Sequence, residues 1–297
     1  MNDQAHKLRS LVKSMSNNQG DNQNNDDLNK AHLYTITSGK GGVGKSNCTA
    51  NLALALQEKG KRVIIFDADL GMANLDVILG VTPSYNLKHV VNGLKSLEEI
   101  IVSGPNGIAL IPGGSGMQEL ANLSQIQINN LISSFVRIGK EYDIILVDTG
   151  AGLGNNVVDF ILGSDEVILV STPEPTSITD AYGVLKTISR YDKRININLL
   201  INQVENHREG EIVSKRLITT ANDFLELEVS LLGVLPKDDS VVKSVKSRRP
   251  FLVEFPKARV SKEIRVIANK VLDQEVENGS PKGIKGFFSN LLGIGRR

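Results

Sequence analysis

The most constraining feature of the sequence is a glycine-rich segment that lies between an apolar run and a run of helix-forming residues. Leu33 to Thr37 are apolar or β-branched, as in a strand, and Thr49 to Leu56 favour a helix that Gly60 is placed to end. Between them, Gly39 to Ser46 fit the pattern G-x-x-x-x-G-K-[ST]. A strand, a glycine-rich loop and a helix in this order predict a phosphate-binding loop in an α/β fold.

The chemistry of such a loop follows from its backbone and its last two side chains. Glycines let backbone N–H groups turn inward around a phosphate, and the positive end of the helix dipole points at the same place. Lys45 would reach the β- and γ-phosphates, and the Ser46 hydroxyl would bind Mg²⁺. An ordinary glycine turn is the alternative. The predicted nucleotide-binding residues of the loop are Gly39, Lys40, Gly41, Gly42, Val43, Gly44, Lys45, Ser46 and Asn47.

Short apolar runs alternate with helix-length segments along the rest of the chain. Such runs are typical of strands that are covered on both faces, so we expect one doubly wound, mostly parallel sheet. Functional loops should lie at the carboxyl ends of its strands. The six further predicted strands are Val63–Phe66, Ile108–Ile111, Ile144–Val147, Val167–Val170, Ile197–Ile201 and Leu231–Leu235.

Acidic residues come directly after two of these predicted strands. Asp67 and Asp69 follow Val63–Phe66, and Asp148 follows Ile144–Val147. An acid behind an apolar strand beside a phosphate-binding loop is the Walker B arrangement, in which the carboxylate holds Mg²⁺ or its water. A helix N-cap is the alternative for Asp67 or Asp69 alone, but three acids at two strand ends favour a metal site.

Composition bounds the class of protein. The chain of 297 residues, with 40% hydrophobic and 23% charged residues, suits one large soluble α/β domain with appendages, or two modest domains. The net charge of +1 gives no sign of bulk nucleic-acid binding. The single cysteine, Cys48, excludes an internal disulfide and is predicted to be a small buried hydrophobe. Without a signal segment or a membrane-spanning run, we expect a cytoplasmic protein.

The two ends of the chain carry amphipathic patterns outside the predicted domain of residues 31–275. In residues 1–15, Ala5, Leu8, Val12 and Met15 fall on one face of a short helix, although a frayed terminus is the alternative. Residues 16–30 are predicted to be a disordered tether, because the stretch 16–27 has no apolar residue.

Residues 276–297 are predicted to be a linker and a membrane-targeting helix. Basic residues flank an apolar face with no acid in the last 16 residues, as in helices that lie on an anionic membrane surface. A terminal helix that docks on the domain is the alternative. The basic run 243–249 is assigned no site. The predicted membrane-facing residues are Ile284, Phe287, Phe288, Leu291 and Leu292.

A lysine stands near each end of the phosphate-binding loop, at Lys40 and Lys45. With this pair, residues 31 to 275 resemble the deviant Walker A family of P-loop ATPases, which includes MinD, ParA, Mrp and nitrogenase iron protein. The resemblance implies an ATP-dependent homodimer in which Lys40 reaches the partner's nucleotide. It also implies Mg²⁺ as cofactor, Asp67 near the metal and Asp69 orienting the attacking water. The catalytic set is then Asp69, Lys40 and Lys45, and a second switch segment at Gly150 and Gly152 approaches the γ-phosphate.

The resemblance also bears on the choice of base. Asn202 follows one predicted strand, and Pro236 to Asp238 follow the last one. MinD-like proteins place an asparagine and a Pro-x-Asp loop beside adenine, and an amide can pair with both edges of that base. The resemblance therefore implies ATP and ADP, contacted by Asn202, Pro236 and Asp238. A simple turn residue is the alternative for Asn202.

The N-terminus narrows the resemblance to the FlhG group, also called FleN or YlxH, which controls flagellar number and placement. Residues 3 to 9 match its Asp-Gln-Ala-x-x-Leu-Arg motif, and residues 148 to 152, Asp-Thr-Gly-Ala-Gly, also look like this group. The motif implies stimulation of an FlhF-type GTPase, with Gln4 placed in the GTP site of that partner. The residues expected to contact it are Asp3, Gln4, Ala5, Leu8 and Arg9.

This resemblance implies a peripheral protein on the inner face of the cell membrane in the ATP state. Flagellar basal-body proteins or transcription regulators are further partners that it allows, and direct contact with nucleic acid is not expected. A MinD-type ATPase that antagonises septation is one alternative, and a non-enzymatic scaffold with a structural nucleotide is another. The presence of Lys40, Lys45, Asp69 and Asp148 speaks against the scaffold.

Overall fold

The computed structural model describes residues 31–69, 74–114, 125–277 and Phe287. The predicted N-terminal helix and tether lie outside the described residues. So does the predicted C-terminal helix, apart from Phe287. Within the described ranges, no helix has the length and apolar character needed to cross a bilayer.

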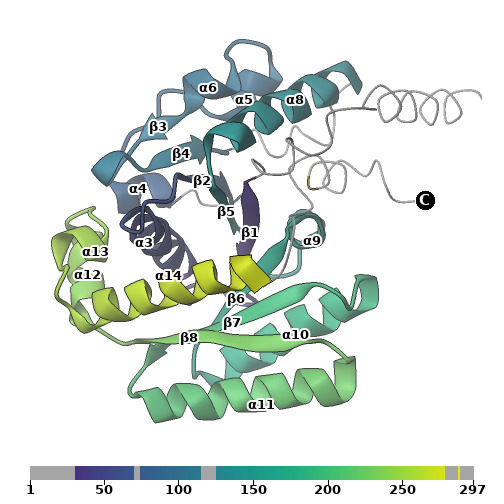
Figure 1. Ribbon diagram of the computed structural model, residues 1–297, viewed down its shortest axis with the longest axis vertical. Helices are drawn as coiled ribbons and strands as arrows, with labels where there is room; N and C mark the ends of the chain where they lie inside the picture. The colour runs from purple at the N-terminus through teal and green to yellow at the C-terminus, as the bar shows by residue number, and fades with distance from the viewer. Residues whose placement is uncertain (1–30, 70–73, 115–124, 278–286, 288–297) are drawn as a thin grey trace, which may run out of the picture.

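Within the described residues, a single sheet of eight strands organises the domain, in the order β3-β4-β2-β5-β1-β6-β7-β8 (Figure 1). Every neighbouring pair is parallel except β3 and β4, so the predicted mostly parallel sheet is confirmed. The strands are β1 (His32–Thr37), β2 (Val63–Ala68), β3 (Val102–Ser103), β4 (Ala109–Pro112), β5 (Ile144–Thr149), β6 (Glu166–Ser171), β7 (Asn196–Val204) and β8 (Val229–Pro236).

Two details of the strand prediction were wrong. The two-residue edge strand β3 was not predicted, because it is too short to show a pattern. Strands β2 and β5 also continue through Asp67 and Asp148 instead of ending before them, and β7 and β8 likewise continue through Asn202 and Pro236. The backbones of Asp67 and Asp148 are therefore held by the sheet and not by a following loop.

Helices connect the strands and cover both faces of the sheet. They are α3 (Lys45–Gln57), α4 (Leu75–Leu79), α5 (Leu87–Val91), α6 (Leu97–Ile100), α8 (Gln125–Glu141), α9 (Asn155–Gly163), α10 (Pro175–Tyr191), α11 (His207–Leu225), α12 (Asp239–Lys246), α13 (Phe251–Glu254) and α14 (Arg259–Glu277), with a 3₁₀ turn, η2, at Pro105–Gly107. The first of these, α3, begins at Lys45, four residues before the predicted start, so the helix grows directly out of the phosphate-binding loop. It ends at Gln57, just before Gly60, whose φ of 84° is left-handed.

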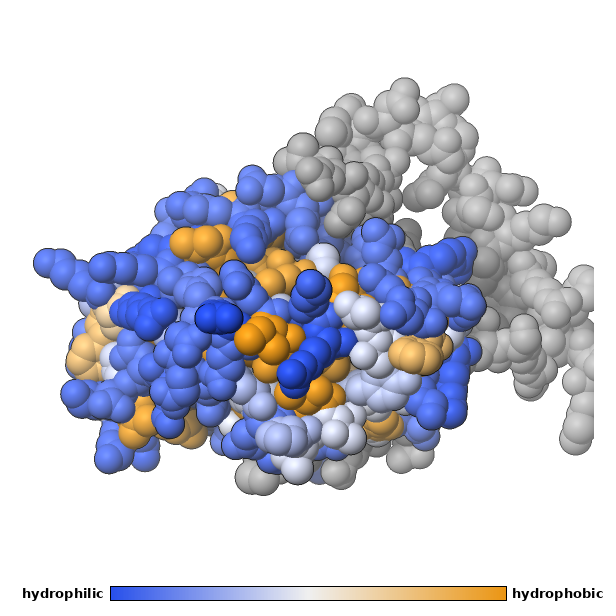
Figure 2. Space-filling view, turned by 90° about the horizontal axis from the view of Figure 1, so that it is seen from below, coloured by the Kyte–Doolittle hydropathy of each residue, from blue (hydrophilic) through white to orange (hydrophobic). Residues whose placement is uncertain are grey.

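Alternate side chains of the central strands pack into hydrophobic cores on opposite faces of the sheet. Ile36, Ile65 and Leu146 pack under α3 and α14 on one face. Phe66 and Val147 point to the other face, where α8 and α9 cover them, and α10 and α11 cover β6 to β8 on the same side (Figure 1). Seen from the side of α11, the coloured surface is mainly hydrophilic, and its hydrophobic areas are small and broken up (Figure 2).

Helix α3 is buried along nearly its whole length, so its polar residues need internal partners. Cys48 is 3% exposed, which confirms the prediction of a small buried side chain, and burial raises the pKa of its thiol to about 12. Asn51 is fully buried and bridges two segments. Its Nδ2 donates to the carbonyl of Asn47 at 2.8 Å, and its Oδ1 accepts from the backbone N–H of Leu252 at 2.8 Å.

We predict that Asn51→Ala lowers the free energy of unfolding by about 1–3 kcal/mol, because the N–H of Leu252 would lose its acceptor inside the core. Urea unfolding at neutral pH measures the change. Asn222→Ala, at an exposed position of α11, is the matched control and should leave stability within about 0.5 kcal/mol of wild type. Equal stability of the two variants would contradict the bridging role of Asn51.

Candidate active site

The carboxyl ends of β1, β2 and β5 bring the loop and the acids together at the centre of the sheet. Asp67 and Asp148 are directly paired in register across β2 and β5. The Nζ of Lys45 lies 2.8 Å from Oδ1 of Asp148, and both side chains are buried. Thr49, one helical turn after Lys45, donates its hydroxyl to the same oxygen at 3.0 Å. Helix α3 thus places two donors on the acid of the neighbouring strand.

Asp67 lies in an environment that disfavours its charge. Burial, and then the nearby charge of Asp148, raise the pKa of Asp67 to about 7 from an ordinary value of 3.8. The backbone N–H of Asp69 donates to it at 3.2 Å, which opposes the rise only in part. Two carboxylates, Asp67 and Asp148, lie near one lysine, Lys45, and all three side chains are buried. An added cation would balance the second negative charge.

The donor set fits Mg²⁺ better than a metal that needs a full protein cage. Carboxylate oxygens are hard ligands, and Ser46 adds a hydroxyl in the first turn of α3. Within the described residues there is no group of three or more His, Cys, Asp and Glu side chains that could enclose a metal. Mg²⁺ commonly takes only one or two carboxylates and fills its other positions with water and substrate phosphate.

The other half of the loop is held by the end of β7. Nδ2 of Asn202 donates to the carbonyl of Val43 at 2.8 Å, and Nε2 of Gln203 donates to the carbonyl of Gly42 at 3.4 Å. A register shift after Ile201 and a left-handed φ of 60° at Gln203 aim both amides at the loop. Gly44 has a φ of 88°, and a Cβ there would lie 2.4 Å from Nδ2 of Asn202, so only glycine suits this position.

These contacts bear on the residues expected at adenine. The Oδ1 of Asn202 accepts from the N–H of Gln203 at 2.9 Å, so both ends of the amide are engaged within the protein. Asp238 caps α12 by accepting from the N–H of Ser240 at 2.9 Å, and it also accepts from the N–H of Val260. Pro236 closes β8. Contact of these three residues with a base stays a prediction.

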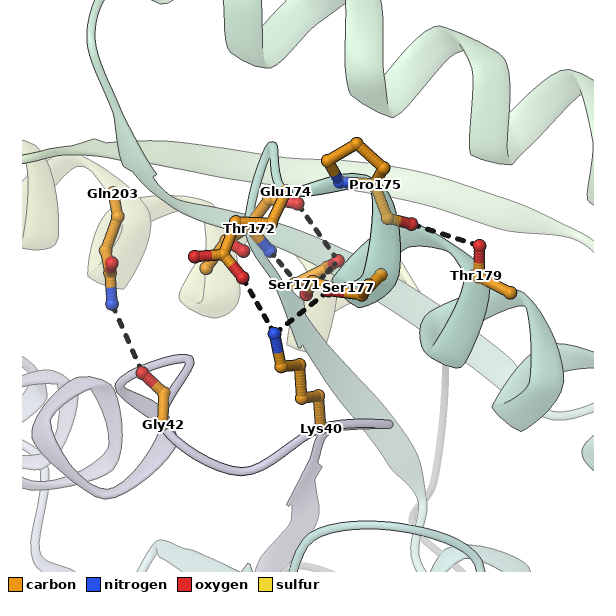
Figure 3. Close-up of polar contacts among 10 residues, drawn as sticks. Lys40, Gly42, Ser171, Thr172, Glu174, Pro175, Ser177, Thr179 and Gln203 are labelled. Atoms are coloured by element: carbon orange, nitrogen blue, oxygen red, sulfur yellow. Dashed lines mark hydrogen bonds and ion pairs between the residues drawn. The ribbon is translucent and has the colours of Figure 1, made fainter.

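Lys40 extends from the start of the loop toward the first turn of α10 (Figure 3). Its Nζ lies 2.8 Å from Oε2 of Glu174 and 2.9 Å from Oγ1 of Thr176. Helix and loop are in direct backbone contact here, because a Cβ on Gly39 would lie 2.3 Å from the carbonyl carbon of Asp180. Lys40 is therefore held at the start of α10, and its ion pair stays accessible to water.

The two predicted switch segments lie next to each other. A Cβ on Gly150 would lie 3.4 Å from Oδ1 of Asp69, so this aspartate stands over the start of the second segment. The N–H of Gly152 donates to the carbonyl of Ser38 at 2.9 Å, which ties the second segment to the end of β1. Asp69, Asp67 and Asp148 thus converge on one place, as predicted from their positions behind two strands.

Several contacting residues were not identified from the sequence. Thr49 lies four residues after Lys45, on the same face of α3, and that spacing is the signal that could have found it. Glu174, Thr176 and Gln203 belong to no motif, and only the tertiary structure brings them to the loop. Phe287, predicted to face a membrane, is 1% exposed and packs against α9, whereas the other four predicted membrane-facing residues lie outside the described residues.

We predict that Asp67→Asn stabilises the metal-free protein at pH 8 by up to about 4 kcal/mol but has little effect at pH 4. Between pH 4 and 7 the folded state keeps a proton on Asp67 that the unfolded state has released, so wild-type stability falls as the pH rises. Asparagine does not ionise, so the variant does not lose stability in this way as the pH rises. Unfolding in EDTA across this range measures the difference, with the exposed Asp223→Asn as control. A pH-independent difference would contradict the raised pKa.

Comparison with known proteins agrees with this geometry. Residues 29–272 match the ParA family, described as NUBPL iron-transfer P-loop NTPase. The chain is 39% identical to the antiactivator FleN of Pseudomonas aeruginosa over 265 residues, which cover 89% of this chain and 94% of FleN. It is 38% identical to the flagellum site-determining protein YlxH of Helicobacter pylori over 302 aligned positions, which cover 98% of this chain and 99% of YlxH.

A solved structure gives the same fold with a nucleotide bound. MinD of Pyrococcus horikoshii in complex with Mg-ADP superimposes with a TM-score of 0.65 at 26% identity, covering 84% of this chain and 99% of that one. The family match spans the phosphate-binding loop, both acid-bearing strands and α14 as far as residue 272. The chain belongs to the ParA/MinD family of P-loop ATPases, in which FleN and YlxH are its relatives.

Proposed function

We propose that the protein is an ATP-driven dimerising switch that regulates flagellar number and placement from the inner face of the cell membrane. The observation that carries the flagellar part is the match to YlxH, which covers 98% of the chain and therefore includes the terminal segments. The septum site-determining protein MinD of Bacillus subtilis is 31% identical over 85% of the chain. The higher identity and wider coverage of the match to YlxH favour a flagellar role over septum placement.

The hydrolytic step follows from the positions of the side chains. Lys45 would leave Asp148 to bind the β- and γ-phosphates, and Ser46, Asp67 and Asp148 would hold the metal or its water. Mg²⁺, when bound, neutralises charge on the phosphate oxygens. Asp69, beside Gly150, orients the attacking water. Asp67 would hold a cation in its deprotonated form, since the cation would offset the nearby charge of Asp148.

In the proposed dimer, each subunit supplies a further positive charge, that of Lys40, to the nucleotide of its partner. Lys40 is 38% exposed and reaches away from its own phosphate-binding loop toward Glu174 and Thr176. An exposed ion pair of this kind contributes little free energy, so it can be exchanged for a phosphate of a partner subunit. In that position Lys40 stabilises the charge of the transition state, as an arginine finger does in other NTPases.

Base recognition and the terminal segments complete the proposal. Asn202, Pro236 and Asp238 line the adenine site, which requires the amide of Asn202 to exchange at least one of its present partners. The N-terminal motif, residues 3 to 9, stimulates an FlhF-type GTPase through Gln4. The C-terminal helix binds anionic lipid through its apolar face, and two copies in a dimer bind more tightly than one.

We predict that Lys40→Ala lowers ATP turnover by at least about 100-fold while nucleotide binding stays near wild type, because Lys40 acts only on the partner's nucleotide. Steady-state phosphate release and equilibrium binding of a fluorescent ATP analogue measure the two effects. Lys193→Ala, at another exposed ion-paired lysine, should change neither.

Lys40→Ala could lose turnover because it no longer dimerises, or because its dimer lacks the catalytic lysine. The oligomeric state separates these two causes. Asp69→Ala should keep an ATP-dependent dimer but lose turnover, as seen by size-exclusion chromatography with Mg²⁺. If the wild-type protein stays monomeric with a non-hydrolysable ATP analogue and Mg²⁺, the dimer mechanism is contradicted.

We predict that Gln4→Ala abolishes stimulation of an FlhF-type GTPase and leaves the protein's own ATP turnover unchanged. Glutamine can position water in a GTPase site, and alanine cannot. GTP hydrolysis by the purified partner, measured with and without the full-length chain, gives the result. Gln19→Ala, a glutamine outside the motif, is the control, and equal stimulation by both variants would rule out the assigned role of Gln4.

A further inference from the structure

Two donors from helix α3 meet on one oxygen of Asp148, and they differ in their freedom to move. The Nζ of Lys45 and the hydroxyl of Thr49 both contact Oδ1, at 2.8 and 3.0 Å. Lysine carries its charge on a flexible four-carbon stem, so Lys45 can turn to a bound phosphate without a change in the backbone. Thr49 is fully buried, and its hydroxyl is attached directly to Cβ. Only the contact of Thr49 can therefore persist when a phosphate takes over Lys45.

The direction of the Thr49 hydroxyl is set by its own helix. Its Oγ1 also lies 3.1 Å from the carbonyl oxygen of Lys45, one turn earlier. A threonine in a helix adopts one of two side-chain rotamers, and a bond to the carbonyl four residues earlier selects between them. The single hydroxyl proton is shared between this carbonyl and Asp148, and the charged acceptor attracts it more strongly. The backbone of α3 thus aims the hydroxyl at Asp148, wherever the side chain of Lys45 lies.

We propose that Thr49 is the positioning residue of Asp148, whose carboxylate it holds ready for a metal ion while Lys45 is engaged with phosphate. This inference rests on the proposed role of Asp148 at the metal. A buried carboxylate that loses its cation and keeps no donor is strongly destabilised, and it would turn to another partner. Thr49 supplies a donor that carries no charge. It can therefore orient the carboxylate without repelling a cation, as a lysine at the same oxygen would.

The orientation of Asp148 matters because it shares the end of the sheet with a second acid. Asp67 and Asp148 are paired in register across β2 and β5, and both side chains are buried. Within the part of the chain that the structure describes, both hydrogen bonds that the side chain of Asp148 accepts end on Oδ1. The other oxygen, Oδ2, is thereby left to serve a cation or its water, and Thr49 decides which of the two oxygens that is.

The test compares metal affinity with nucleotide affinity. Mn²⁺ stands in for Mg²⁺, and electron paramagnetic resonance measures the free ion as it is added to the complex of protein and ADP. We expect Thr49→Val to weaken Mn²⁺ binding about tenfold, the usual scale for losing a group that orients a metal ligand. Binding of ADP in EDTA should stay within about twofold of wild type, because Lys45 and the loop backbone hold the phosphates.

Thr187→Val in α10 is the matched control. The hydroxyl of Thr187 also donates to the carbonyl four residues earlier, that of Gly183 at 3.0 Å, but within the described ranges it bonds to no carboxylate. This variant should bind Mn²⁺ as wild type does. Thr49→Ser and Thr49→Ala form a second pair, which differs by one oxygen, and only the serine variant should keep the wild-type affinity. Thermal unfolding in EDTA checks that each variant is folded.

Wild-type affinity for Mn²⁺ in Thr49→Val, or an equal loss in Thr49→Ser and Thr49→Ala, would overturn the positioning role. A matching loss of ADP affinity in EDTA would overturn it too, since the hydroxyl would then act on the loop. If the wild-type protein with ADP binds no Mn²⁺, the metal site is refuted and the role of Thr49 with it. If the expected differences in Mn²⁺ affinity appear but no ATP is turned over, the proposed switch fails and the role of Thr49 stands.

Discussion

The buried contact between Lys45 and Asp148 is the interaction on which the centre of the structure depends. It joins the first residue of α3 to the end of β5 across 2.8 Å, where both side chains are nearly inaccessible. Breaking a buried pair by removing one partner leaves an uncompensated charge, which is strongly destabilising. The contact therefore holds the phosphate-binding loop against the acid-bearing strand until another anion, such as a phosphate, takes over Lys45.

Asp67 turns this contact into an arrangement that favours a cation. It stands beside Asp148 in register, and its pKa of about 7 reflects the cost of a second buried negative charge. A protonated Asp67 relieves that cost without metal, and a divalent cation relieves it with the charge retained. The same geometry that strains the metal-free site thus favours the binding of a phosphate and a metal together.

The sequence was enough to predict those parts of the site that depend on local pattern. The loop, the sheet and the three acids follow from spacing within a few residues; the sheet is confirmed and the acids lie together at the ends of β2 and β5, while their roles stay a prediction. Glu174 and Gln203 could not be found in this way, since they reach Lys40 and Gly42 from 134 and 161 residues away. The amphipathic pattern around Phe287 fits both a membrane face and a docked face, because lipid and protein core select the same apolar residues.

The contacts to be exchanged differ in strength according to where they lie. The pair of Lys40 and Glu174 has side chains that are 38% and 64% exposed, so solvent screens it and a small gain elsewhere displaces it. Phe287 is buried, and removing its ring from the core would expose a large apolar surface to water. The ion pair of Lys40 is therefore a contact that another charged group can displace, whereas the contact of Phe287 with α9 is held by the burial of a whole aromatic ring.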